Sequence, residues 1–179
     1  MLRSLVGSEM CIRDRGGARP GDVVAVKGRL GWSAAGLFVL TRGFKSPRAV
    51  VSAYRVPEVP YGEGRRAAEA GATSMIDVSD GLLADLGHIA EQSGVGIRIS
   101  SEALDVPDPL QAVAATTGSS PLRFVLTGGE DHALVGTFDQ VDVPSDWAII
   151  GRVAEGGGVL VDDEEWDPEE GTGYVHFQR

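Results

Sequence analysis

The sequence predicts a mixed α+β domain, in which helices pack against a mixed sheet. Short runs rich in valine and isoleucine are interspersed with longer segments whose apolar residues recur at helical spacing. With 179 residues and 42% apolar content, the chain is long enough to bury one core of ordinary size. No apolar run approaches the ~20 residues that a membrane-spanning helix needs, so the sequence argues against a membrane protein.

The first fifteen residues, MLRSLVGSEMCIRDR, have no strand or helix period and are too broken for a signal peptide. They look like a translated, non-native tail. We therefore predict that residues 1–15 are an artefactual, disordered segment and that residues 16–179 form the domain. The only cysteine, Cys11, lies in this tail; one cysteine allows no internal disulfide and fits a reducing compartment, so we expect a cytoplasmic protein.

The first elements are a strand and a helix separated by glycines. After the turn at Pro20–Asp22, the valine-rich run predicts a strand from Val23 to Lys27. The segment GRLGWS then interrupts the pattern, and Ser33 is a candidate N-cap for a helix over 34–44.

Two further helices and a strand precede the most unusual motif. A helix over 47–56 can begin at Pro47, and an alanine-rich helix over 64–72 should stop near Gly71. Residues 72–78 predict a strand that runs directly into another helix. That helix has one apolar side, formed by Leu82, Leu83, Leu86, Ile89 and Ala90.

The remaining sequence continues to mix the two kinds of element. Residues 95–100 alternate like a half-buried strand, and 108–118 predict a helix with Asp108 as cap and Pro109 at its first position. Residues 123–138 contain a glycine break between apolar segments. Residues 147–163 predict two strands joined by a glycine turn, and the segment that follows is acidic and loop-like.

The motif D-x-S-D-G places Asp77, Ser79 and Asp80 where a strand ends and a helix begins. Two readings are open. Asp80 or Ser79 can cap the helix while Asp77 is merely solvated, which is the more common use of these residues at a helix start. Alternatively, the two carboxylates can approach one or two hard cations, because free N–H groups and the helix dipole favour anionic oxygen at this position.

Two other segments carry candidate ligand-binding residues. LTGGEDHAL contains Glu130, Asp131 and His132 after two glycines; a tight turn with solvated acids is the plain alternative to a binding site, and His132 is more often structural than a proton carrier. In GYVHF at the C-terminus, Tyr174 can seal the core or lie against a planar ligand.

The charge balance excludes one class of partner and constrains another. Acidic residues outnumber basic ones 26 to 16, and Lys27 and Lys45 are the only lysines, which argues against nonspecific nucleic-acid binding. Neither a Walker loop, nor a G-x-G-x-x-G loop after a strand, nor an EF-hand loop is present. A protein of this charge that handles phosphorylated ligands needs a cation between carboxylate and phosphate.

Four segments together resemble the C-terminal domain of the thiamine-monophosphate kinase family. They are GDVVAVKGRLGWSAAGL, SMIDVSDGLLADLGHIA, LTGGEDHAL and GYVHF, in this order and at these separations. The similarity runs from about Gly16 to Phe177. The wider superfamily includes aminoimidazole ribonucleotide synthetase, selenophosphate synthetase and a hydrogenase maturation protein, which use ATP in two-domain dimers.

The resemblance implies an enzyme that transfers the γ-phosphoryl group of ATP in line to thiamine monophosphate, giving thiamine diphosphate. By position, Asp77 and Asp80 match magnesium ligands, Ser79 matches an ATP contact, and Glu130 and Tyr174 match contacts to thiamine phosphate. His132 stands where the family often has tyrosine. The family's N-terminal domain, with further ATP and magnesium residues and most of the homodimer interface, has no counterpart in this chain, so we expect the chain alone to be inactive.

Two alternatives stay open at this point. One is another ATP-using member of the superfamily, of the hydrogenase maturation or purine synthesis type, with a different acceptor. The other is a ligand-binding domain without catalytic activity.

Overall fold

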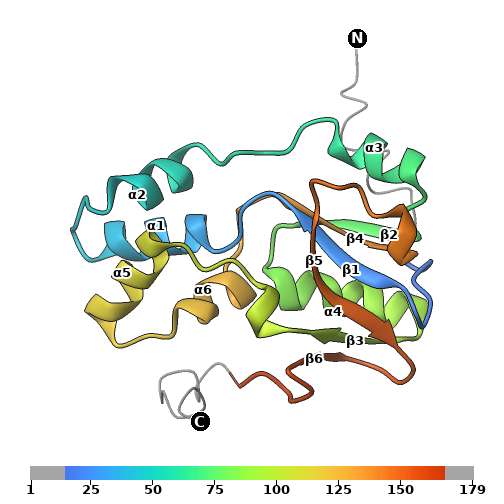
Figure 1. The fold of residues 1–179 in the computed structure, drawn as a ribbon. Coiled ribbons are helices and arrows are strands. Elements are labelled where there is room, and N and C mark those ends of the chain that lie inside the picture. The colour runs from blue at the N-terminus through green and yellow to red at the C-terminus, as the bar shows by residue number, and fades with distance from the viewer. Residues whose placement is uncertain (1–14, 168–179) are drawn as a thin grey trace.

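The structure, a computed structural model, describes residues 15–167. The expected tail at 1–15 lies outside the described residues except for Arg15, and so does Tyr174. Six strands form one sheet in the order β2-β4-β1-β5-β3-β6 (Figure 1). All neighbouring strands are antiparallel except β3 and β6, which are parallel. The strands are β1 Val23–Lys27, β2 Ser74–Val78, β3 Gly96–Ile99, β4 Ala133–Phe138, β5 Ala148–Ala154 and β6 Val159–Val161.

Six α-helices and two short 3-10 helices complete the described part of the chain, so the predicted α+β class with a mixed sheet is confirmed. None of its helices is long and apolar enough to cross a membrane. The helices are α1 Trp32–Thr41, α2 Arg48–Arg55, α3 Glu63–Ala70, α4 Leu82–Ser93, η1 Ser101–Ala103, α5 Asp108–Thr117, α6 Pro121–Thr127 and η2 Gln140–Asp142.

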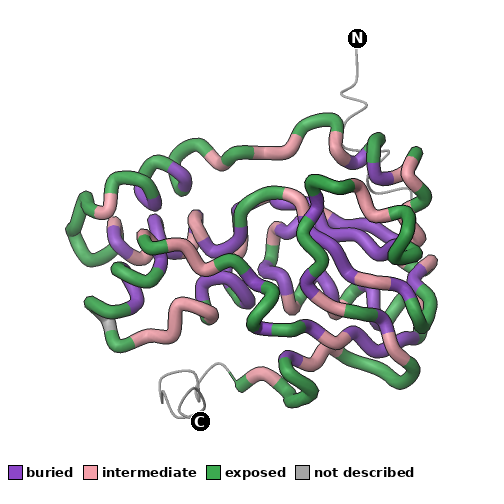
Figure 2. The backbone as a smooth tube through the Cα atoms, viewed as in Figure 1, coloured by how far each residue is buried: buried purple, intermediate pink, exposed green. Residues whose placement is uncertain are grey.

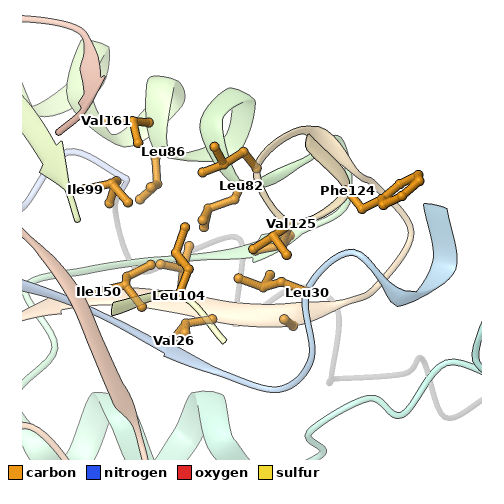
Figure 3. Close-up of a cluster of buried hydrophobic side chains, with 14 of the residues drawn as sticks. Val26, Leu30, Leu82, Leu86, Ile99, Leu104, Phe124, Val125, Ile150 and Val161 are labelled. Atoms are coloured by element: carbon orange, nitrogen blue, oxygen red, sulfur yellow. The ribbon is translucent and has the colours of Figure 1, made fainter. Parts of the chain in front are cut away.

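The main hydrophobic core lies between one face of the sheet and α4, and it continues between α1, α5 and α6 (Figures 1 and 2). In α4, Leu82, Leu86, Ile89 and Ala90 are buried, which confirms the predicted apolar side, while Leu83 is half-buried. Figure 3 shows Leu82 near Val125 of α6 and Leu86 near Val161 of β6, with Val26 of β1 on the other side of the cluster. Ile76 and Val78 of β2 belong to the same core, so the chain is anchored on both sides of the turn that joins β2 to α4.

The opposite face of the sheet carries a smaller core covered by α3. Met75, Leu134 and Phe138 belong to it together with Trp147, whose ring packs edge-on against Phe138 at 5.3 Å between centroids. Asp77 pairs with Leu134 across β2 and β4. Because directly paired residues of neighbouring strands project to the same face, Asp77 lies on this second face.

A network of charged side chains ties α3 to the rest of this face. The carboxylate of Asp146 accepts from Lys27 Nζ at 2.6 Å and from Arg66 at 2.8 Å. Arg66 also binds Glu63 at 2.8 Å, and Glu63 accepts from the indole of Trp147 at 3.1 Å. Hydrogen bonds from Arg66 and Lys27 lower the pKa of the Asp146 carboxyl, because they stabilise its charged form.

Two features of the fold are not apparent in the sequence. The apolar run before the glycine break, over 121–127, is the helix α6. The two strands predicted over 147–163 are present as β5 and β6, but they do not pair with each other, because β3 lies between them.

The helices α1 and α2 meet at Gly36, and this contact gives a testable prediction. A Cβ atom at Gly36 would collide with the carbonyl oxygen of Val50 and come within 2.6 Å of the Cβ of Tyr54. We expect Gly36→Ala to lower the free energy of unfolding by about 2 kcal/mol or more, since α2 would have to move away. Urea unfolding of both proteins measures the difference.

Gly87, in the middle of α4, is the matched control because a Cβ there meets no atom within 4 Å. Gly87→Ala should be neutral or stabilise the protein by about 0.5–1 kcal/mol, the usual preference for alanine within a helix. Equal destabilisation by both changes would show that the Gly36 contact is unimportant.

Candidate functional site

Three loops that are far apart in the sequence meet at one place. They are the loop before α1 (28–31), the turn from β2 to α4 (79–81) and the loop from α6 to β4 (128–132). The Glu130 N–H donates to the Ser79 carbonyl at 2.9 Å, and the Ser33 hydroxyl donates to the Glu130 carbonyl at 2.9 Å. The loops therefore form one hydrogen-bonded unit, which brings the D-x-S-D-G and G-G-E-D-H motifs side by side.

Glycines allow the loops to approach this closely. A Cβ at Gly129 would collide with the Ser79 carbonyl oxygen, and a Cβ at Gly31 would lie 2.7 Å from the Phe124 carbonyl carbon. Gly31 also has a φ of 81°, a backbone conformation that residues other than glycine rarely adopt. The glycine break at Gly128 and Gly129 thus allows close backbone contact between the two motifs.

The start of α1 is capped by Asp131, from the third loop. Its carboxylate accepts the Gly31 N–H at 2.5 Å and the Ser33 N–H at 2.7 Å. The prediction of Ser33 as N-cap is wrong: α1 begins at Trp32, and the Ser33 hydroxyl donates to Glu130 instead. Burial raises the pKa of the Asp131 carboxyl, while the hydrogen bonds from Ser33 and Gly31 act against that shift.

Asp85, within the first turns of α4, caps the turn from β2 to α4. Its Oδ2 accepts the N–H groups of Ser79 and Asp80, each at 3.0 Å, and of Gly81 at 3.2 Å. The predicted capping by the side chain of Asp80 or Ser79 is wrong, because the helix begins after Gly81 and the buried Asp85 takes that role. The anionic oxygen expected at this helix start is therefore Oδ2 of Asp85.

Asp85 is a residue that sequence reasoning missed. The available signal was an acidic residue in the first helical turn, four positions after a glycine, at the spacing from which a side chain can reach back to the N–H groups before the helix. Burial raises the pKa of the Asp85 carboxyl, although the three N–H groups favour its charged form.

The predicted metal ligands Asp77 and Asp80 are placed differently. Asp80 is exposed, and its carboxylate lies with a carboxylate oxygen of Asp85 and a ring nitrogen of His88 in a group whose atoms are within 4.8 Å of one another. Asp77 is half-buried at the end of β2 and does not belong to this group. Within the described residues, neither the Asp77 nor the Asp80 carboxylate makes a hydrogen bond or ion pair.

The carboxylate oxygens in this group fit a hard divalent cation. Magnesium prefers carboxylate oxygens and keeps several waters, so it needs only one or two protein ligands. The free, exposed carboxylate of Asp80 meets that requirement, whereas Oδ2 of Asp85 is already shared among three N–H groups. A histidine nitrogen such as that of His88 is a poor partner for magnesium and better suited to transition metals.

Glu130 and His132 both have left-handed backbone conformations, with φ of 64° and 53°. The His132 N–H donates to the Val78 carbonyl at 3.0 Å, which extends the contact between the two motifs. The Glu130 side chain is 76% exposed, and its Oε2 lies 3.6 Å from Nε2 of His132. Because most of the Glu130 side chain is exposed, it can meet a ligand next to the Ser79 turn. Tyr174 lies outside the described residues.

Comparison with known proteins finds thiamine-monophosphate kinases as relatives of this chain. A thiamine-monophosphate kinase from Mycobacterium tuberculosis is 51% identical over 166 residues, which are 92% of this chain and 48% of the relative. A solved structure of AaThiL complexed with AMPPCP and TMP matches with a TM-score of 0.79 and 37% identity, over 86% of this chain and 52% of that one. The chain thus spans about half the length of the relatives it matches.

A more distant structure shares the fold alone. The hydrogenase maturation protein HypE from E. coli has a TM-score of 0.60 and 21% identity, over 83% of this chain and 48% of its own. Residues 19–163 match the family model for the AIR synthase related protein, C-terminal domain. The chain therefore belongs to the family of AIR synthase related protein C-terminal domains, and within it the chain is similar to thiamine-monophosphate kinases.

Proposed function

We propose that this chain is the C-terminal half of a thiamine-monophosphate kinase, which transfers the γ-phosphoryl group of ATP to thiamine monophosphate and releases thiamine diphosphate and ADP. The observation that carries the proposal is the hydrogen bond from Glu130 to the Ser79 carbonyl, because it joins the two motifs that resemble the family's substrate and ATP-metal positions. The 51% sequence identity to a thiamine-monophosphate kinase supports thiamine monophosphate as the acceptor.

The proposed residue roles rest on the resemblance to the family, position by position. Asp77 and Asp80 hold magnesium, Ser79 contacts ATP, and Glu130 and Tyr174 contact the thiamine phosphate. Within residues 15–167 the carboxylates of Asp77 and Asp80 make no hydrogen bond or ion pair, and this and the exposure of Glu130 support these roles. The Glu130 carboxylate, placed beside the cationic thiazolium ring of the substrate, would provide charge complementarity.

Transfer of the phosphoryl group depends on positioning the two phosphates and on neutralising their charge, more than on proton transfer. The acceptor is a phosphate oxygen that is ionised at neutral pH, so the barrier comes from bringing two polyanions together. Magnesium, when bound, would neutralise part of that charge and orient the phosphates. The chain's own task is to hold the Asp80 carboxylate in place, and the N–H groups of the turn, which donate to Asp85, fix the backbone that carries Asp80.

The state of the Ser79–Gly81 N–H groups also supports a cation. A helix start often binds phosphate directly through free N–H groups. Here those groups already donate to Asp85, so this turn offers a ligand its side chains, the Asp80 carboxylate and the Ser79 hydroxyl, and not its backbone N–H groups. A phosphate that approaches the Asp80 carboxylate needs a cation between the two negative groups.

The proposal extends to the whole protein. Residues 16–179 form the C-terminal domain, residues 1–15 are a non-native tail, and the complete enzyme is a cytoplasmic homodimer whose N-terminal domain supplies the rest of the ATP site. The chain alone should be inactive for that reason.

The test uses the full-length protein, encoded by the genomic reading frame that contains residues 16–179. We expect it to form thiamine diphosphate from thiamine monophosphate, ATP and magnesium, as measured by chromatography of the products. Formation of ADP only with a different acceptor would instead favour another member of the superfamily. Binding of ligands without any turnover would favour a non-catalytic domain.

A further inference from the structure

A cavity of about 420 Å³ lies between α1, α6 and the segment that precedes α6. Phe38 and Phe124 form part of its wall and pack edge-on, with their ring centroids 5.6 Å apart. Arg42, Arg123, Ser119 and Thr127 supply its polar lining. No carboxylate belongs to the described residues that line it.

The two arginines at this cavity are not neutralised. Within residues 15–167, neither Arg42 nor Arg123 forms an ion pair, whereas Arg29, Arg65 and Arg66 each have an acidic partner. The Arg42 guanidinium instead lies over the Phe38 ring, 3.4 Å from its centroid. In a chain of net charge −10, two guanidinium groups without acidic partners at one cavity form a local positive site.

The cavity adjoins the candidate functional site. Gly128 lines it, and the next residue, Gly129, packs against the Ser79 carbonyl. The Thr127 carbonyl oxygen lies against Gly81, where a Cβ atom would approach to 2.9 Å. The segment 127–129 is therefore shared by the cavity and by the turn that carries Asp80.

We propose that this cavity binds the phosphate group of a phosphorylated ligand between Arg42 and Arg123, with the Phe38 and Phe124 rings beside it. Guanidinium groups bind phosphate through paired, charge-assisted N–H bonds, and an aromatic wall accommodates a planar organic part. The phosphate can come from a nucleotide or from thiamine phosphate. Beside the proposed magnesium site at Asp80, this cavity would be a second place where phosphate binds, and its binding would need no metal. The inference does not depend on turnover by the enzyme.

The experiment titrates the 179-residue chain, without magnesium, with inorganic phosphate, thiamine monophosphate and the nucleotide analogue AMPPCP, using calorimetry at low salt. We expect inorganic phosphate to bind, and Arg42→Gln and Arg123→Gln each to weaken its binding by roughly tenfold. Arg123→Lys keeps the charge but not the paired geometry and should lose less. Arg55→Gln is the control, since Arg55 is an exposed arginine at the end of α2, away from the cavity.

Each outcome decides the proposal. Loss in the two cavity variants but not in Arg55→Gln supports it, and the organic ligand whose binding falls in parallel identifies the source of the phosphate. If neither falls in parallel, the cavity is a site for free phosphate. No binding of inorganic phosphate, or equal weakening by Arg55→Gln, overturns it. An inactive full-length enzyme would contradict the proposed function and leave these titrations unaffected.

Discussion

Asp80→Asn in the full-length protein should reduce the rate of thiamine diphosphate formation by roughly a hundredfold or more. The change removes one negative charge and one anionic oxygen from the proposed magnesium site, and a metal that stabilises phosphoryl charge contributes several kcal/mol. Because the Asp80 side chain is exposed and makes no hydrogen bond or ion pair in the described part of the chain, the fold should survive the change. A titration with magnesium at saturating ATP measures both the rate and the metal requirement.

Asp105→Asn is the control for this prediction, since Asp105 is exposed in the loop between η1 and α5, outside the described group of metal-binding donors. It should leave the activity unchanged. Unaltered turnover in Asp80→Asn would remove the metal role of Asp80. A loss of activity that high magnesium restores would place Asp80 in metal binding and not in the chemical step.

Asp85→Ala should lower the free energy of unfolding by about 3 kcal/mol, or roughly 10 °C in the melting temperature. It leaves the N–H groups of Ser79, Asp80 and Gly81 without their acceptor at the buried start of α4. Asp85→Asn should cost far less, because one amide oxygen can replace the Oδ2 atom that accepts all three bonds. Thermal unfolding followed by circular dichroism compares the two variants.

The same pair separates a structural role of Asp85 from a role as metal ligand. If Asp85 only holds the turn, Asp85→Asn keeps most of the activity of the full-length protein; if it binds magnesium with Asp80, Asp85→Asn loses activity as Asp80→Asn does. Asp139→Ala is the control for stability, since the exposed Asp139 side chain accepts the N–H of Val141 alone among the described residues, and the loss of that bond should cost under about 1 kcal/mol.

Local patterns in the sequence were sufficient for most of the elements. The valine run of β1, the apolar side of α4 and the glycine after α5 each mark an element through its own residues. The helix α6 was missed because its seven residues are too few to show a helical period. The position of β3 between β5 and β6 depends on pairing between distant segments, which no local pattern encodes.

The candidate site was predictable in its residue types but not in its internal bonds. Clustered acids and glycines indicated where ligands could bind. The sequence could not show that Asp131 caps a helix whose first residues lie about one hundred positions earlier. Nor could it separate Asp77, on the α3 face of the sheet, from Asp80 beyond the end of the strand.

The bonds that join the three loops have a consequence for the dynamics of the protein. The amides of Gly31 and Ser33 depend on Asp131, those of Ser79, Asp80 and Gly81 depend on Asp85, and the Glu130 amide depends on Ser79. Local opening of one loop removes partners from the others, so these segments belong to one cooperative unit whose amides exchange with solvent together. A ligand that binds any one loop would then slow exchange at all three.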